Sequence, residues 1–107
     1  MSYRVLVTEK AQRDLESACA WWAQNRSREQ AQRWYAGIAA AIRSLAEAPE
    51  RYPRAQESES AAIELRQVHY GLGHRPTHRA VFTIRENTVV ILRVRHLAQD
   101  QIGPGDI

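Results

Sequence analysis

Apolar residues recur along the N-terminal half of the chain with two different spacings. Residues 3–7 are apolar and rich in β-branched side chains, which predicts a short strand that ends at Thr8, a residue type favoured at helix N-caps. After Thr8, apolar residues return every three or four positions, which predicts an amphipathic helix that runs to about residue 24. Ser27 opens a capping-box pattern, so a second helix is expected to begin there and to end before Pro49. Two helices with a short link predict an antiparallel hairpin.

The C-terminal half alternates between extended and loop-forming segments. Residues 49–62 contain two prolines and a run of polar residues, which predicts a loop. Alternation and β-branched residues predict three strands, at residues 63–68, 79–84 and 88–94. The last two strands should form a hairpin, and beyond Leu97 the pattern is lost, which predicts a frayed end.

These elements predict an α+β fold with two layers. In the order β-α-α-β-β-β, a helical hairpin packed on one face of a small, mainly antiparallel sheet buries both helical stripes. A chain of 107 residues is long enough for one domain, so residues 1–107 are expected to form a single domain, with 97–107 as a frayed tail. No apolar run reaches the ~20 residues of a membrane helix, and the N-terminus lacks the apolar core of a signal peptide. We therefore expect a cytoplasmic protein with no membrane partner.

The charged residues are unevenly distributed and strongly biased towards arginine. Of the 15 basic residues, 14 are arginine, and residues 63–96 carry a net charge of +4 against +1 for residues 1–62. Arginine binds phosphates and carboxylates with two hydrogen bonds, which suits a nucleic acid or an acidic protein partner. A G+C-rich coding sequence is the alternative explanation of the same bias.

Five cationic residues lie on or at the ends of the predicted strands: Arg66, Arg79, Arg93, Arg95 and His96. A two-residue turn at Glu86 and Asn87 puts Arg79 on the same face as His96, whereas a three-residue turn sets Arg79 beside Arg93 and Arg95. We favour the two-residue turn because asparagine tolerates a positive φ. A histidine flanked by arginines can cleave a phosphodiester by acid–base catalysis, and the alternative is a solvated charged face.

Other chemistries find little support in the sequence. There is no glycine-rich phosphate loop, and the single cysteine cannot complete a ligand set with the scattered histidines, so we expect no cofactor and no metal. Trp22 and Trp34 lie on the helical stripes and are expected in the core. Trp21 and Tyr35 flank the stripes, which favours a protein-binding surface on the hairpin.

The motifs YRVLVT, AQRDL, LAEAP, ELR, HRAVFTI and VILRVRH, in this order over roughly residues 3–100, resemble the RelE/ParE superfamily of toxins from type II toxin–antitoxin modules, often described as plasmid stabilisation proteins. The resemblance implies a bacterial toxin that inhibits growth and is neutralised by a cognate antitoxin, whose extended segment would wrap the hairpin and the sheet. RelE-like members cleave mRNA on the ribosome without a metal, and ParE-like members poison DNA gyrase.

The same resemblance assigns candidate residues. Arg66 matches the arginine of a Leu-Arg pair on the second strand, Arg79 the arginine that opens the third, and His96 the histidine that ends the fourth. The sequence lacks the lysines and the glutamate of the RelE pattern around the second strand and a tyrosine after His96, so we favour a ParE-like toxin. The alternatives are a ribosome-dependent endoribonuclease and a non-toxic domain that binds an acidic partner. The remaining expected contacts are Arg93 and Arg95 for the target, and Trp21 and Tyr35 for the antitoxin.

Overall fold

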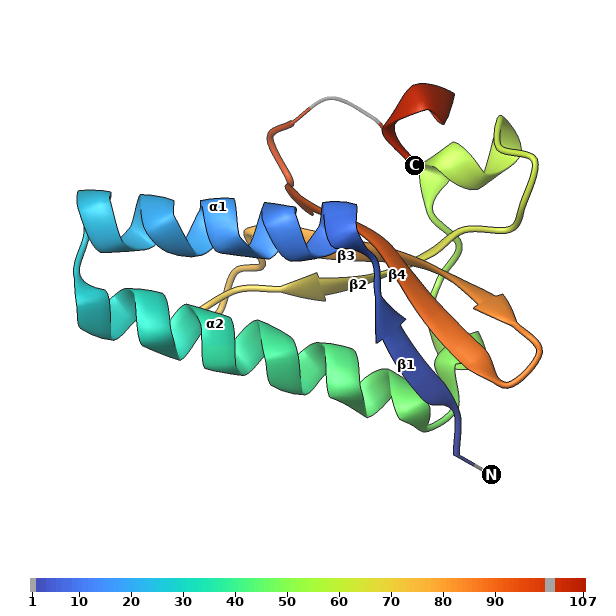
Figure 1. The fold of residues 1–107 in the computed structure, drawn as a ribbon, viewed down its shortest axis with the longest axis horizontal. Helices are drawn as coiled ribbons and strands as arrows, with labels where there is room; N and C mark the ends of the chain where they lie inside the picture. Colours follow the sequence, from blue (N-terminus) through green and yellow to red (C-terminus); the bar gives the residue numbers. More distant parts are fainter. Residues whose placement is uncertain (1, 100–101) are drawn as a thin grey trace.

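The computed structural model describes residues 2–99 and 102–107. Two antiparallel helices lie side by side on one face of a four-stranded sheet, which confirms the predicted α+β architecture and element order (Figure 1). The elements are β1 (Arg4–Val7), α1 (Glu9–Asn25), α2 (Arg28–Arg43), β2 (Arg66–Tyr70), β3 (His78–Arg85) and β4 (Thr88–His96).

Both helices begin at the residues that the sequence indicates. The Thr8 hydroxyl accepts a hydrogen bond from the backbone N–H of Ala11 at 3.2 Å, and the Ser27 hydroxyl accepts one from Gln30 at 3.1 Å. Each cap satisfies a donor that the first helical turn leaves without a partner. After α2, a short 3₁₀ turn (Ser44–Ala46) leads towards Pro49. None of the helices in the described ranges has the length and apolarity that crossing a membrane requires.

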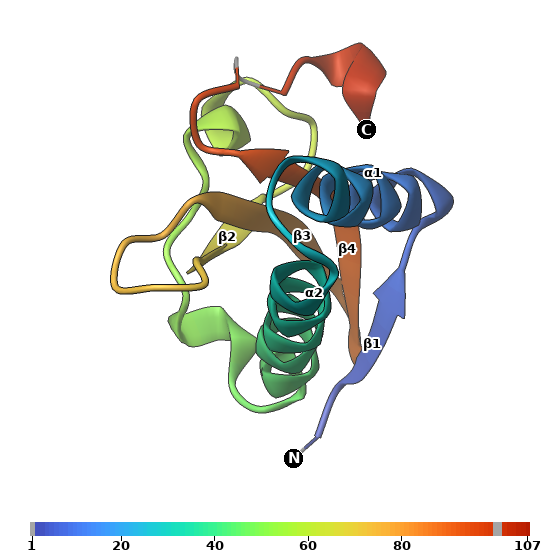
Figure 2. The same ribbon diagram turned by 90° about the vertical axis from the view of Figure 1, so that its left-hand side faces the viewer.

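The strand order is β1-β4-β3-β2, with β1 parallel to β4 and the other two pairings antiparallel. The first strand of the chain therefore lies beside the last, although the two termini lie on opposite sides of the molecule (Figure 2). The main core fills the space between the helices and this sheet, and its largest member, Trp34, is fully buried as the helical stripe predicts. The sheet supplies the other half of this core, including Val68, Ala80, Phe82, Val89, Ile91 and Val94.

The opposite face of the sheet carries a second, smaller core. Ala55, Leu65, Val81 and Ile102 are buried together there. Ile102 belongs to the segment after Leu97, where the sequence predicts a frayed end. The predicted loop 49–62 contains two 3₁₀ turns (Pro49–Arg51 and Gln56–Glu59).

The second strand begins later than predicted, at Arg66 instead of residue 63. Leu65 bonds to the preceding loop instead, because its carbonyl accepts from the Ala55 N–H at 2.8 Å and its own N–H donates to the Ser58 hydroxyl at 2.9 Å. These contacts hold the chain against the back face before it enters the sheet.

The β3–β4 hairpin has the favoured two-residue turn. Arg85 pairs with Thr88 across it, with Glu86 and Asn87 at the tip. The positive φ that was expected at Asn87 falls on Glu86 instead, at 56°.

A β-bulge then changes the register within the same hairpin. Phe82 pairs with Ile91 but Val81 pairs with Arg93, so Leu92 is an extra residue on β4. Beyond the bulge Arg79 pairs with Arg95, and His96 pairs with His78. The expectation that the two-residue turn places Arg79 and His96 on one face is therefore wrong, because one inserted residue inverts the alternation of the strand.

Candidate functional site

Two histidines meet where β3 begins and β4 ends. The rings of His78 and His96 lie 5.0 Å apart and nearly perpendicular, and the His78 ring also lies 4.9 Å from Trp34. His78 is only 8% exposed, and its Nδ1 lies 2.8 Å from the Thr77 hydroxyl. Burial lowers the pKa of the His78 imidazole to about 4, and the neighbouring His96 adds to this shift. His78 is therefore neutral at physiological pH.

The chain that follows β4 orients His96. The backbone N–H of Ala98 donates to Nδ1 of His96 at 3.0 Å, while the backbone N–H of His96 donates to the Gln99 side-chain oxygen at 2.7 Å. Because Nδ1 accepts a hydrogen bond, the proton of the neutral ring lies on Nε2. This ring is exposed, so its Nε2–H can donate a hydrogen bond to a bound group.

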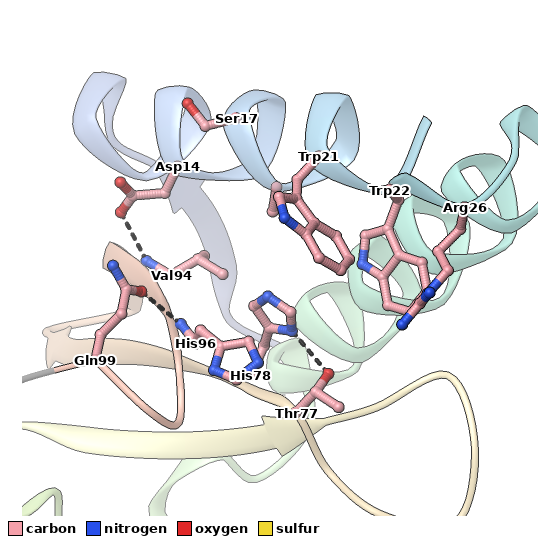
Figure 3. Close-up of a pocket in the computed structure, with 11 residues that line it drawn as sticks. Asp14, Ser17, Trp21, Trp22, Arg26, Thr77, His78, Val94, His96 and Gln99 are labelled. Atoms are coloured by element: carbon pink, nitrogen blue, oxygen red, sulfur yellow. Dashed lines mark hydrogen bonds between the residues drawn. The ribbon is translucent and has the colours of Figure 1, made fainter. Parts of the chain in front are cut away.

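The histidine pair forms one wall of a pocket of about 630 Å³ between α1 and the adjoining ends of β3 and β4 (Figure 3). The opposite wall is aromatic: the Trp21 and Trp22 rings lie 5.5 Å apart at 89°, and the Arg26 guanidinium lies 5.8 Å from the centre of the Trp21 ring. The remaining lining residues are Asp14, Ser17, Ala18, Thr77, Val94 and Gln99. Such a volume suits a small ligand or one or two side chains of a partner.

The candidate Arg79 is bound to carboxylate and amide oxygens on the back face of the sheet. It forms a two-pronged ion pair with Glu57 and also donates to the Gln67 side-chain oxygen at 2.8 Å. The Arg79 and Glu57 side chains are 11% and 3% exposed. Hydrogen bonding from Arg79, together with the Ile102 N–H, lowers the pKa of Glu57 to about 2 although burial opposes the shift.

Two further arginines are also held internally. Arg93 donates to both carboxylate oxygens of Asp14, at 2.7 and 2.9 Å, and reaches the Asp106 carbonyl at 2.7 Å. Arg66 donates to the Tyr52 carbonyl at 2.6 Å and forms an ion pair with Glu64 at 3.1 Å. Much of the basic charge of the C-terminal half is thus bound to the protein's own oxygen atoms.

The three nuclease candidates do not converge. Arg79 lies on the back face, whereas Arg66 and His96 lie on the face that the helices cover. Arg66 pairs with Phe82 and His96 with His78, four positions apart along β3, or about 13 Å. Their catalytic role stays a prediction.

The residues expected to bind partners are also separated. Trp21 is 50% exposed at the pocket, whereas Tyr35 is half-buried and its hydroxyl accepts from the Gln12 amide at 3.2 Å. Gln12 and Trp21 are nine residues apart on α1, about 13 Å along the helix, so the two aromatic residues do not form one pair. Arg95 is half-buried and lies beside Arg79 on the back face.

Sequence reasoning missed Glu57, His78 and Arg26 as members of these arrangements. Glu57 lies in the polar loop, and no local pattern connects it with an arginine 22 residues away. A signal existed for His78, because it alternates with Ala80 and Phe82 and so belongs to the buried face of its strand.

Comparison with known proteins gives this fold a context. The fold is similar to that of a chain in the chromosomal ParDE toxin–antitoxin system from P. aeruginosa, with a TM-score of 0.72 and 19% identity over 89% of this chain and 96% of that one. It matches the RelBE2 toxin–antitoxin complex from Mycobacterium tuberculosis with a TM-score of 0.59 and 27% identity, over 92% and 95% of the two chains. Among curated protein sequences, none matches significantly.

The fold is thus that of chains found in toxin–antitoxin systems. Residues 5–101 match the family described as the ParE toxin of the type II toxin–antitoxin system parDE. The chain belongs to this ParE toxin family, within the RelE/ParE superfamily that the sequence motifs indicate.

Proposed function

We propose that this ParE-family toxin inhibits growth by binding DNA gyrase in the bacterial cytoplasm, and that a cognate antitoxin neutralises it. The observation that carries the proposal is that Arg66, Arg79 and His96 do not converge on one point, since Arg79 faces away from His96. A toxin that acts by binding needs no such convergence.

Electrostatics supports the same conclusion. Catalysis of phosphodiester cleavage requires cations directed at the charge that develops on the phosphate. Arg79 is instead paired with the buried Glu57, and separating the two would leave a buried carboxylate without a partner. Arg93 is likewise paired with Asp14. Neither guanidinium is available to a phosphate without the loss of an internal ion pair.

The test combines two assays on the purified full chain. We expect micromolar toxin to inhibit supercoiling by gyrase and to leave ribosome-bound mRNA intact. The double variant Arg79→Lys/His96→Ala should inhibit gyrase as the wild type does, provided that its circular dichroism spectrum is native. Unaffected supercoiling at these concentrations would refute the gyrase proposal.

The second candidate is a ribosome-dependent, metal-independent endoribonuclease. It is favoured by His96, an exposed histidine at a pocket, and by the likeness to the RelBE2 complex. It predicts that mRNA is cut in the ribosomal A site and that His96→Ala alone abolishes the cut. If expression without the antitoxin causes no growth defect, both candidates fail and a non-toxic interaction domain remains.

A further inference from the structure

The pocket between α1 and the histidine pair has features that favour a protein ligand. Its walls are mainly apolar rings, with Trp21 half-exposed at the rim and Trp22 deeper. A solvent-exposed tryptophan beside a pocket is a feature of protein-binding hot spots, since burial of its large apolar area stabilises a complex.

An unpaired hydrogen-bond donor lies at this wall. The indole nitrogen of Trp22 is buried and, among the described residues, has no hydrogen-bond acceptor. Figure 3 shows this nitrogen on the side of the ring that faces Trp21 and the two histidines. A buried donor without an acceptor costs about 1–3 kcal/mol. A bound carbonyl or carboxylate oxygen would remove that cost after a small movement of the rings.

The charge of the pocket is also one-sided. Within residues 2–99 and 102–107, no carboxylate lies in ion-pair distance of the exposed Arg26 guanidinium. The carboxylate of the pocket, Asp14, is already bound by Arg93 and by the backbone N–H of Val94 at 2.9 Å. A ligand that enters the pocket therefore meets a cation at Arg26 and no competing free anion.

We propose that this pocket binds an acidic peptide segment by one aromatic side chain. The aromatic ring of the peptide packs edge-to-face against Trp21 and the two histidines. A carboxylate next to that ring in the peptide forms an ion pair with Arg26, and a peptide oxygen accepts a hydrogen bond from the indole N–H of Trp22. The proposal concerns the chemistry of recognition and holds whether gyrase or the ribosome is the target.

A nucleic acid fits the site less well. Its affinity comes from several phosphate contacts made together, and a nucleic-acid groove needs a row of available cations. Here Arg26 is the cation at the pocket, and the nearby Arg93 is held by Asp14. Because the pocket offers aromatic contacts without that row of cations, it favours the aromatic side chain of a peptide over a nucleic-acid base.

The experiment uses ¹⁵N-labelled full-length toxin and three short probes. The first is an acetylated, amidated peptide of sequence EFDE, the second replaces its phenylalanine with alanine, and the third replaces its acidic residues with lysine. Uridine and adenosine monophosphates serve as nucleotide probes. The three indole N–H signals report the site: Trp21 and Trp22 line it directly, whereas the buried Trp34 contacts it only through His78.

We expect EFDE to shift the Trp21 and Trp22 signals more than that of Trp34, and both altered peptides to bind at least about tenfold more weakly. Arg26→Gln should weaken EFDE binding by about two- to fivefold. Trp21→Ala, at a half-exposed position, should abolish binding without unfolding the chain. The matched control is Arg43→Gln, an exposed arginine at the far end of α2, which should change nothing.

Three results would overturn the proposal. The first is the absence of Trp21 and Trp22 shifts at millimolar EFDE. The second is equal binding of the lysine peptide, which would remove the role of Arg26. The third is tighter binding of a nucleotide than of EFDE at the same two signals, which would assign the pocket to nucleic acid. None of these results depends on gyrase inhibition.

Discussion

Replacement of Arg79 with methionine should destabilise the fold before it affects any chemistry. The substitution keeps most of the side-chain volume but removes the guanidinium that neutralises Glu57, whose side chain is 3% exposed. The pKa of Glu57 is lowered from 4.5 to about 2. Since one pKa unit corresponds to about 1.4 kcal/mol, the lowered pKa represents about 3 kcal/mol of folding stability. This agrees with the ~3–5 kcal/mol that breaking a buried ion pair costs.

The lowered pKa also determines the pH range of the effect. The folded state favours ionised Glu57, so the stabilisation is complete above about pH 4.5 and is lost as pH falls from there to about 2. Arg79→Met and Glu57→Gln should each remove this slope from the pH dependence of unfolding. The loss at pH 7 should be larger for Arg79→Met, which leaves the carboxylate of Glu57, at 3% exposure, without its cation. Glu57→Gln leaves Arg79, which is more exposed and still bound to the Gln67 oxygen, and it keeps an acceptor for the Ile102 N–H.

Urea denaturation between pH 2 and pH 7 measures both effects. The double variant Glu57→Gln/Arg79→Met should recover at least half of the stability that Arg79→Met loses at pH 7, since it has no unpaired charge. Arg43→Met, at an exposed site on α2, should cost less than about 0.5 kcal/mol. A loss below 1 kcal/mol for Arg79→Met, or a loss independent of pH, would refute the ion-pair reasoning. If Arg79→Met reduces toxicity and the double variant recovers it, the effect of Arg79 on toxicity is structural and not catalytic.

Three further predictions concern the core and the turn. Trp34→Ala should cost about 3–5 kcal/mol in urea denaturation, because the side chain is fully buried; a loss under 1 kcal/mol would contradict its place in the core. Glu86→Gly should raise stability by about 1 kcal/mol, because a φ of 56° strains a residue with a Cβ; unchanged or lower stability would argue against that strain. The wild type should lose stability as pH falls from 6.5 to about 4, because unfolded chains protonate His78 first, and His78→Phe should flatten this range; an unchanged slope would refute the assignment.

The helices were predictable because their determinants are local. Thr8 and Ser27 cap the turns that directly follow them, and Trp34 lies in a stripe repeated every three or four residues. The two-residue hairpin turn is equally local, since its strands are adjacent in the sequence.

The geometry of the candidate residues was predictable only in part. The sequence identifies Arg79 and His96 as chemically capable, but one bulge residue, Leu92, decides that they face opposite sides of the sheet. A bulge inserts one residue into a strand and shifts the alternation of its side chains between the two faces of the sheet, and the hydrophobic pattern of the sequence does not reveal where this happens. The predicted start of β2 was wrong for a related reason: the backbone of Leu65 is hydrogen-bonded to Ser58 and Ala55 in the preceding loop, and no local pattern indicates these contacts.

The sequence by itself determined the two-layer α+β class, the helical hairpin and membership of the toxin superfamily, because caps, periodicity and motif order are properties of neighbouring residues. Only the tertiary structure decided which charges are available. Arg79 forms an ion pair with Glu57, which lies in a polar loop, and Arg93 forms one with Asp14 on α1. Arg26 stays exposed beside two tryptophans. Whether an arginine binds a partner or a buried carboxylate depends on residues that only folding brings within hydrogen-bond distance.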